Sequence, residues 1–255
     1  MQSFDSDGVN LAYIDVAPTG PDRGEPIVLV HGFASNHRVN WVNPRWVDAL
    51  TKDGRRVIAL DNRGHGRSEK LYDPELYRTD ILASDVANLI AHLGLGRVDL
   101  MGYSMGARIV AFLALARPDL SRSIILGGLG AHLVEGVGLP IGIADAMQAP
   151  SLASLTDPMQ RMFRAFAEQT GSDLQALAAC MRGTRQTLTE AEVGEIVAPT
   201  LVAVGTKDNI AGDGRKLAMM FANGASLEIP GRDHNLAVGD KIYKAGALAF
   251  LDERP

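Results

Sequence analysis

Val98-Asp-Leu-Met-Gly-Tyr-Ser104-Met-Gly106 joins an apolar run to a helical pattern. The run Val98–Met101 predicts a buried strand, and residues 107–116 predict a helix. A Gly-x-Ser-x-Gly motif therefore stands at a strand-to-helix turn. Because the two glycines lack Cβ atoms, strand and helix can approach closely around Ser104, whose hydroxyl then projects clear of the sheet. This setting is typical of a nucleophilic serine.

The composition indicates an ordinary globular protein. Of 255 residues, 46% are hydrophobic and 22% are charged, and the net charge of -5 gives no electrostatic support for nucleic acid or an anionic membrane as a partner. The single cysteine, Cys180, excludes an internal disulfide and is typical of a reducing compartment. The first residues lack a signal-peptide pattern, and no apolar run reaches the roughly 18 residues of a membrane span. We expect a cytoplasmic protein.

Apolar strands alternate with helical patterns along most of the chain. The predicted strands are 9–15, 26–30, 56–60, 98–101, 122–126, 200–204 and 225–229. The predicted helices between and after them are 46–52, 79–93, 107–116 and 243–251. This alternation predicts an α/β fold with a mostly parallel sheet flanked by helices on both faces. In such sheets, sites lie beyond the carboxyl ends of the strands.

One long segment, 131–196, interrupts the alternation and shows no strand pattern. Two stripes of apolar residues recur there at helical spacing: Met159-Met162-Phe163-Phe166 and Leu174-Leu177-Ala178-Met181. Thr189 begins a further predicted helix. We expect a helical cap at 131–196, inserted between the two parts of an α/β core at 1–130 and 197–255. The alternative is that these helices belong to the core layer.

A nucleophilic serine needs a base, and the base needs an orienting group. Only His234 follows the last predicted strand, in a turn-rich loop that can reach Ser104. Asp208 ends the preceding strand and is the predicted acid. Asp213 is its main rival, and Asp233 lies so near His234 in sequence that it would need an awkward geometry. We predict Ser104 as nucleophile, His234 as base and Asp208 as the orienting acid.

Several stretches of the chain together resemble the α/β-hydrolase fold superfamily, across almost the whole length. They are His31-Gly-Phe33, Asp61-Asn-Arg-Gly-His-Gly-Arg-Ser68, Gly102-Tyr-Ser-Met-Gly106, Gly205-Thr-Lys-Asp208 and Gly231-Arg-Asp-His234. The order Ser-Asp-His matches that superfamily. The resemblance implies an esterase- or lactonase-like hydrolase with a helical cap, and an oxyanion hole formed by the backbone N–H groups of Phe33 and Met105. We expect His31 to shape its loop and Arg63 to be structural.

The predicted activity is hydrolysis of a small-to-medium, uncharged ester, thioester or lactone through an acyl-enzyme. Carbon–carbon bond hydrolysis and perhydrolysis use the same triad and remain open. A small-molecule binding or signalling protein on this fold is the alternative of a different class. The serine argues against epoxide hydrolases and haloalkane dehalogenases, which carry a carboxylate there. We predict no cofactor and no metal, because no ligand cluster or dinucleotide motif is present.

The apolar stripes lead to a prediction about the substrate pocket. We expect them to form a roof above Ser104, with Met162 and Phe166 contacting the substrate; flexible methionines would make that roof adaptable. The opposite helix faces carry three arginines that we expect to face water or the rim: Arg161, Arg164 and Arg182. The alternative is that the stripes only pack the cap onto the core.

Overall fold

The computed structural model describes residues 1–136 and 138–254, built around an eight-stranded sheet of order β1-β2-β4-β3-β5-β6-β7-β8. Strands β3 to β8 run parallel, whereas β2 pairs antiparallel with β4 and β1 pairs antiparallel with β2. The strands are β1 (Gln2–Ser6), β2 (Val9–Val16), β3 (Ile27–Val30), β4 (Val57–Leu60), β5 (Val98–Tyr103), β6 (Ser121–Gly127), β7 (Thr200–Gly205) and β8 (Gly224–Ile229).

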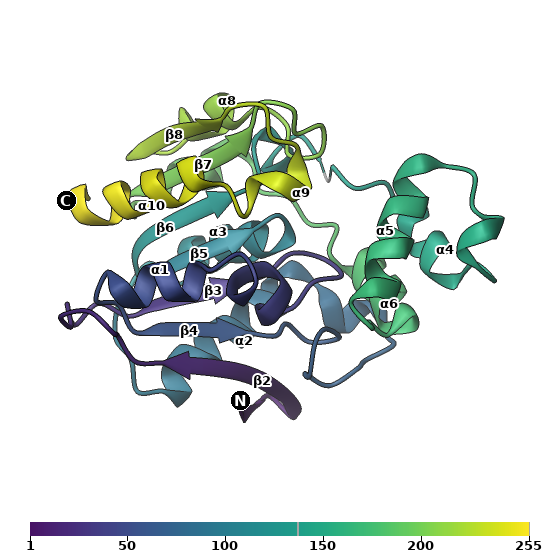
Figure 1. Cartoon of the computed structure of the whole chain (residues 1–255), viewed down its shortest axis with the longest axis horizontal. Helices are drawn as coiled ribbons and strands as arrows, with labels where there is room; N and C mark the ends of the chain where they lie inside the picture. The colour runs from purple at the N-terminus through teal and green to yellow at the C-terminus, as the bar shows by residue number, and fades with distance from the viewer. Residues whose placement is uncertain (137, 255) are drawn as a thin grey trace.

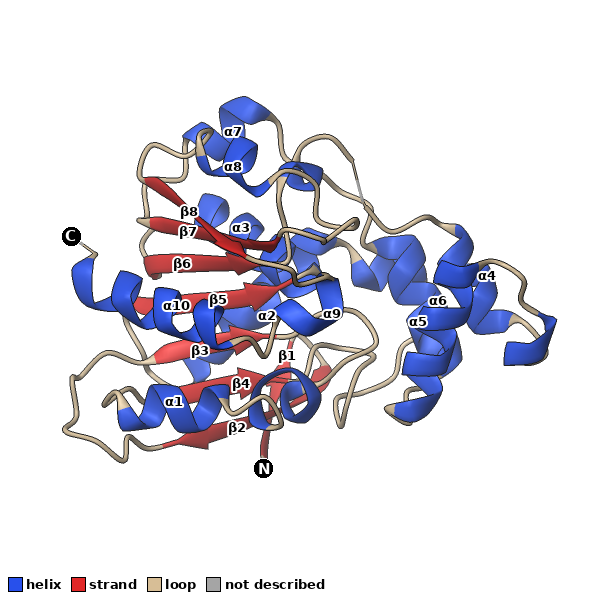
Figure 2. Ribbon diagram, turned by 45° about the horizontal axis from the view of Figure 1, so that its top comes forward, coloured by secondary structure: helices blue, strands red, loops and turns tan. Residues whose placement is uncertain are grey.

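Helices cover both faces of the sheet (Figure 1 and Figure 2). One face carries α1 (Trp46–Lys52) and α10 (Lys241–Glu253), and the other carries α2 (Thr79–His92) and α3 (Met105–Ala116). In β3, Ile27 and Leu29 pack with the first pair of helices, while Val28 and Val30 pack with the second. Because both faces are covered, β3 reads as a continuous apolar run rather than an alternating one.

The segment between β6 and β7 contains only helices and loops among its described residues. Its longer helices stand together beyond the carboxyl ends of the strands (Figure 1). They are α4 (Gly142–Gln148), α5 (Pro158–Gln169) and α6 (Leu174–Gly183), whereas the short α7 (Glu190–Gly194) packs against α3. The division at 131 and 196 stays a prediction, and the helices beyond the sheet lie within 142–183.

The remaining helices are short. They are α8 (Gly214–Ala218) beside β7 and β8, α9 (His234–Ala237), the π-turn η1 (Arg38–Val42), and the 3-10 turns η2 (Pro74–Tyr77), η3 (Ala131–Leu133) and η4 (Leu152–Ser154). No helix in the described part of the chain is long and apolar enough to cross a membrane.

The predicted fold class is confirmed, and every predicted strand is present with its ends shifted by at most two residues. Strand β1 is missing from the prediction. Its sequence is mostly polar, and only Phe4 and Ser6 are buried. One apolar side chain on an edge strand gives too weak an alternation to be recognised.

A buried ion pair joins the loop after β4 to α2. Arg63 donates hydrogen bonds to both carboxylate oxygens of Asp85, at 2.7 Å each, and to Leu76 O at 3.0 Å. The Ser6 hydroxyl also donates to Asp85. Both charged side chains are almost fully buried. Through these hydrogen bonds, the Arg63–Asp85 pair joins the loop after β4 to β1, η2 and α2, which agrees with the structural role expected for Arg63.

We predict that Arg63→Met destabilises the protein by about 3–5 kcal/mol, because Asp85 is left as an unpaired buried charge. The matched control is Arg78→Met, which removes an exposed ion pair with Asp80 and should cost less than about 1 kcal/mol. Urea unfolding followed by circular dichroism measures both. Equal effects of the two substitutions would contradict the structural role of Arg63.

Candidate active site

Ser104 occupies the turn between β5 and α3 with φ 55° and ψ -115°, a conformation that non-glycine residues rarely adopt. Positions 102 and 106 must be glycine, because a Cβ atom at either one would clash with the backbone. A Cβ on Gly102 would lie 2.2 Å from Gly106 O, and one on Gly106 would lie 2.0 Å from Val30 O. The close crossing of strand and helix therefore holds Ser104 in its strained turn at the sheet edge.

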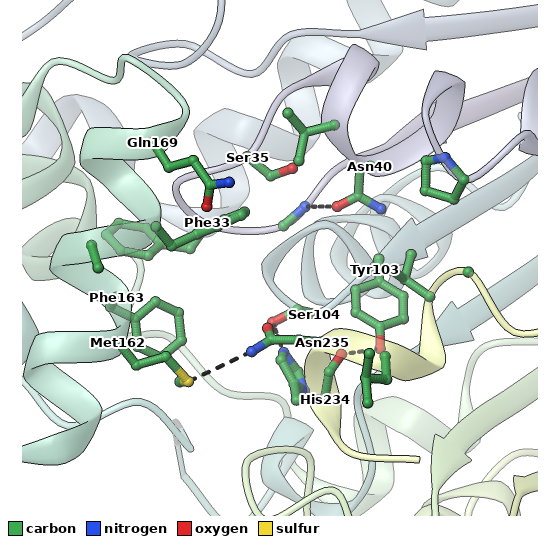
Figure 3. Close-up of a pocket in the computed structure, with 18 residues that line it drawn as sticks. Phe33, Ser35, Asn40, Tyr103, Ser104, Met162, Phe163, Gln169, His234 and Asn235 are labelled. Carbon is green, nitrogen blue, oxygen red and sulfur yellow. Dashed lines mark hydrogen bonds between the residues drawn. The ribbon is translucent and has the colours of Figure 1, made fainter.

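The structure brings together the side chains of Ser104, His234 and Asp208. Ser104 Oγ lies 2.9 Å from His234 Nε2, and His234 Nδ1 lies 2.8 Å from Asp208 Oδ2. Figure 3 shows Ser104 and His234 close to each other on the same side of a pocket. His234 is the first residue of α9 rather than part of an irregular loop. With Nδ1–H donating to the carboxylate, Nε2 is free to accept the serine proton.

The Asp208 carboxylate is fixed at both oxygens. Oδ1 accepts the backbone N–H groups of Ile210 and Ala211 at 2.9 and 3.0 Å, which leaves Oδ2 for the imidazole. The rival carboxylates have other partners. Asp213 caps α8 and Asp233 caps α9, each by accepting two backbone N–H groups. Asp208 is therefore the acid that contacts the ring.

Two backbone N–H groups beside Ser104 have no acceptor among the described residues. Met105 is the first residue of α3, where helix amides have no intrahelical partner, and Phe33 follows β3. Hydrogen bonds of the buried His31 hold the loop that carries Phe33. His31 Nδ1–H donates to Gly32 O at 2.8 Å, and Asn62 N–H donates to His31 Nε2 at 3.0 Å. Burial lowers the pKa of His31, so the neutral ring can accept that bond.

The Asp61–Ser68 stretch is hydrogen-bonded to the same loop through Asp61 and His37. Asp61 accepts hydrogen bonds from the N–H and the ring of His37 and from Arg67 N–H, at 2.7 to 2.9 Å. Burial raises the pKa of Asp61, but these bonds outweigh it and lower the pKa to about 2. A Cβ on Gly66 would lie 2.2 Å from the carboxylate, so the turn requires glycine. The charged Asp61 thus ties the Phe33 loop to the loop after β4.

A cavity of about 600 Å³ opens onto Ser104 and lies between the core and α5 (Figure 3). We call it the large cavity. Its described lining holds no Lys, Arg, Asp or Glu, and His234 is its only titratable side chain apart from Tyr103. The lining residues are Gly32, Phe33, Ser35, Val39, Asn40, Pro44, Tyr103, Ser104, Met162, Phe163, Ala165, Phe166, Gln169, His234, Asn235, Leu236, Val238 and Gly239. Both cap residues singled out from the sequence, Met162 and Phe166, are among them.

The expected placement of the cap arginines is wrong for Arg164. Its side chain is buried and donates to Ala146 O and Ala149 O at 2.8 and 2.9 Å, at the C-terminal end of α4. Arg161 binds backbone carbonyls of the loop before α5, and Arg182 binds side chains of α4. The carbonyl groups at a helix end attract cations, which explains why a buried arginine is satisfied there. None of the three lines the large cavity.

Two residues that line the large cavity, Tyr103 and Asn40, were not predicted from the sequence. Tyr103 OH donates to His234 O, and burial raises the pKa of the phenol well above its usual range, so it stays a donor. Asn40 Oδ1 accepts Gly32 N–H at 3.2 Å and fixes the backbone before Phe33. Tyr103 fills a variable position of the Gly-x-Ser-x-Gly motif, and Asn40 lies in the short π-turn η1, which no sequence pattern predicted. Only the folded arrangement reveals either role.

Comparison with known proteins gives a consistent family. Residues 25–174 match the alpha/beta hydrolase fold. A non-heme chloroperoxidase of Streptomyces lividans is 28% identical, with 96% of this chain and 97% of that protein covered. The AB hydrolase superfamily protein YisY of Bacillus subtilis is 30% identical, with 74% of this chain and 76% of that protein covered.

A Bacillus subtilis protein named "Putative 2-succinyl-6-hydroxy-2,4-cyclohexadiene-1-carboxylate synthase" is 34% identical, with 48% of this chain and 41% of that protein covered. Among solved structures, the enol-lactonase from Burkholderia xenovorans LB400 has a TM-score of 0.78 at 20% identity, covering 99% of this chain and 100% of that one. That likeness concerns the fold. The family match spans more than half of the residues and includes the strand, turn and helix around Ser104. The chain belongs to the alpha/beta hydrolase fold family.

Proposed function

We propose that this protein is a serine hydrolase that cleaves small-to-medium, uncharged esters or lactones through an acyl-enzyme intermediate. The observation that carries the proposal is the continuous chain of contacts from Ser104 Oγ through His234 to Asp208, at 2.9 and 2.8 Å. Serine alone is a weak nucleophile at neutral pH, and an oriented imidazole removes its proton as it attacks.

Each residue of the proposed set has a definite task. His234 Nε2 takes the Ser104 proton during attack and returns it to the leaving oxygen. Asp208 holds the ring in the tautomer that leaves Nε2 free, and stabilises the imidazolium that forms. Tyr103 acts as a positioning residue, because it binds the His234 carbonyl.

The backbone N–H groups of Phe33 and Met105 are the proposed oxyanion hole. Both are without a protein acceptor in the described chain, and both flank Ser104. The negative charge of a tetrahedral intermediate needs donors that are already oriented before reaction. The bonds that His31 and Asn40 make to Gly32 supply that fixed orientation on the Phe33 side.

The lining of the large cavity supports the proposed substrate class. Apolar side chains such as Phe33, Met162 and Phe166 dominate it, and its described lining holds no lysine or arginine to pair with a carboxylate. Burying an unpaired charge is costly, so a neutral substrate is favoured. Thioester and carbon–carbon bond hydrolysis would use the same set of residues and remain within the proposed chemistry.

Perhydrolysis is a second candidate, because a relative named a non-heme chloroperoxidase matches 96% of this chain. Hydrogen peroxide would replace water in the attack on the acyl-enzyme and give a peroxy acid. Formation of peracetic acid from an acetate ester and hydrogen peroxide, lost in Ser104→Ala, tests it. A binding or signalling protein is the remaining alternative, and it would show no turnover.

The proposal predicts that the wild type hydrolyses p-nitrophenyl acetate and that Ser104→Ala lowers kcat by about 10³-fold or more. Alanine replaces serine with little change in volume, so circular dichroism and thermal unfolding should match the wild type. A variant that folds and retains most of the rate would exclude Ser104 as the nucleophile.

For the acid, we predict that Asp208→Asn lowers kcat by about 10²- to 10⁴-fold, because an amide favours the wrong histidine tautomer. Asp213→Asn is the matched control. Asparagine caps helices as well as aspartate does, so this variant should keep both stability and rate. The reverse ranking of the two rates would move the acid to Asp213.

For the substrate, we predict that methyl 4-acetoxybenzoate is hydrolysed at least about tenfold better than 4-acetoxybenzoate, after correction for their alkaline hydrolysis rates. Phe166→Ala and Met162→Ala should raise KM for the neutral ester. A preference for the anionic ester would contradict the proposed substrate class.

A further inference from the structure

A second, much smaller chamber also opens onto Ser104. Its volume is about 40 Å³, and we call it the small chamber. It shares only Phe33 and Ser104 with the large cavity. Its lining residues are Phe33, Ser104, Met105, Arg108, Gly128, Leu129, His132, Gly138, Leu139, Met181, Thr184 and Ile210.

The two spaces differ in which catalytic groups they contact. His234 lines the large cavity and is absent from the lining of the small chamber. Met105, which carries one proposed oxyanion donor, lines the small chamber and not the large cavity, whereas Phe33, which carries the other, lines both spaces. The nucleophile stands at the junction, because Ser104 lines both spaces.

This difference between the two spaces indicates where the acyl group and the leaving group of an ester would lie. In the first step Ser104 Oγ bonds to the carbonyl carbon and its proton passes to His234 Nε2. The bond to the leaving oxygen then breaks as His234 returns that proton, so the leaving group must lie beside His234. Water next attacks the acyl carbon with His234 as base, and the carboxylic acid departs as Ser104 recovers its proton.

We propose that the small chamber is the acyl pocket and that the large cavity holds the leaving group. This assignment rests on the proposed serine hydrolase function and narrows its substrate class. The protein would then be selective for short acyl groups and tolerant of large alcohols, a pattern that the 600 Å³ cavity alone does not predict.

The size of the small chamber sets the acyl length. A water-sized group needs roughly 10–15 Å³ on this measure, so about three such groups fit. Acetyl, propionyl and butyryl groups place up to three carbons beyond the carbonyl. The buried apolar walls of the chamber are formed by Leu129, Leu139, Met181 and Ile210. Filling a packed wall with further methylenes would force side chains out of their rotamers.

Three polar side chains of the small chamber bind backbone carbonyls, and one of them is His132, whose Nδ1 lies 2.6 Å from Ile210 O. Arg108 donates to four backbone carbonyls, those of His132, Leu133, Gly136 and Gln186. The Thr184 hydroxyl donates to Cys180 O at 2.8 Å. The buried apolar walls at Leu129, Leu139 and Met181 therefore define the part of the chamber that fits an unsubstituted alkyl chain.

The experiment uses p-nitrophenyl esters from acetate to octanoate, which keep the leaving group constant. The wild-type kcat/KM should fall about tenfold or more between butanoate and hexanoate. Acetates of alcohols from methanol to 2-naphthol should all remain substrates. Met181→Ala should open the chamber wall and restore hexanoate by about tenfold relative to acetate; Leu139→Ala serves if that variant does not fold.

Met147→Ala is the matched control. It removes a buried methionine of the same cap that lines neither space, so its acyl profile should match the wild type. Octanoate hydrolysed as well as acetate by the wild type, or an acyl profile moved by Met162→Ala and not by Met181→Ala, would overturn the assignment.

The two proposals fail in different ways. Loss of activity on every ester in Ser104→Ala, together with a flat acyl profile in the wild type, would leave the serine hydrolase standing and reject only the acyl pocket. Full activity in Ser104→Ala would reject the hydrolase mechanism itself.

Discussion

The structure depends on one close approach, that of α3 against β3 and β5. A Cβ on Gly106 would lie 2.0 Å from Val30 O, so the helix can begin there only because position 106 is glycine. That contact forces Ser104 into its left-handed turn at φ 55°. It also leaves the Met105 amide at the helix start, beside the hydroxyl. The proposed nucleophile and one proposed oxyanion donor are thus positioned by a single packing constraint.

The rest of the site is assembled from loops that follow parallel strands, and buried hydrogen bonds fix each loop. Asp61 ties the Phe33 loop to the loop after β4, and Asp208 binds two amides of its own loop before it reaches His234. Both carboxylates are buried and fully engaged. Rigid loops of this kind keep catalytic groups oriented before substrate arrives, which is the source of electrostatic catalysis. Above Ser104, α5 lines the large cavity, and Met181 of α6 lines the small chamber together with residues of the core.

The sequence was sufficient to predict every strand of the sheet except β1, and to predict which side chains meet at the sheet edge. Strands buried on both faces, such as β3, are continuous apolar runs, and the carboxyl ends of parallel strands bring Ser104, Asp208 and His234 to one edge. Features that depend on packing across elements were not predictable. Arg164 has helical spacing typical of a solvent-facing side chain, yet it turns into the carbonyl end of α4. The small chamber likewise combines residues from α3, α6 and three loops, and no local pattern joins them.

The central claim is that Ser104 is a nucleophile activated by His234. Its most direct measurement is covalent labelling with a fluorophosphonate, followed by peptide mass mapping of the wild type and of His234→Gln. The account predicts a single adduct on the peptide that contains Ser104, with a labelling rate that falls by at least about 10²-fold in His234→Gln. Labelling at another residue, or an unchanged rate without the histidine, would contradict it.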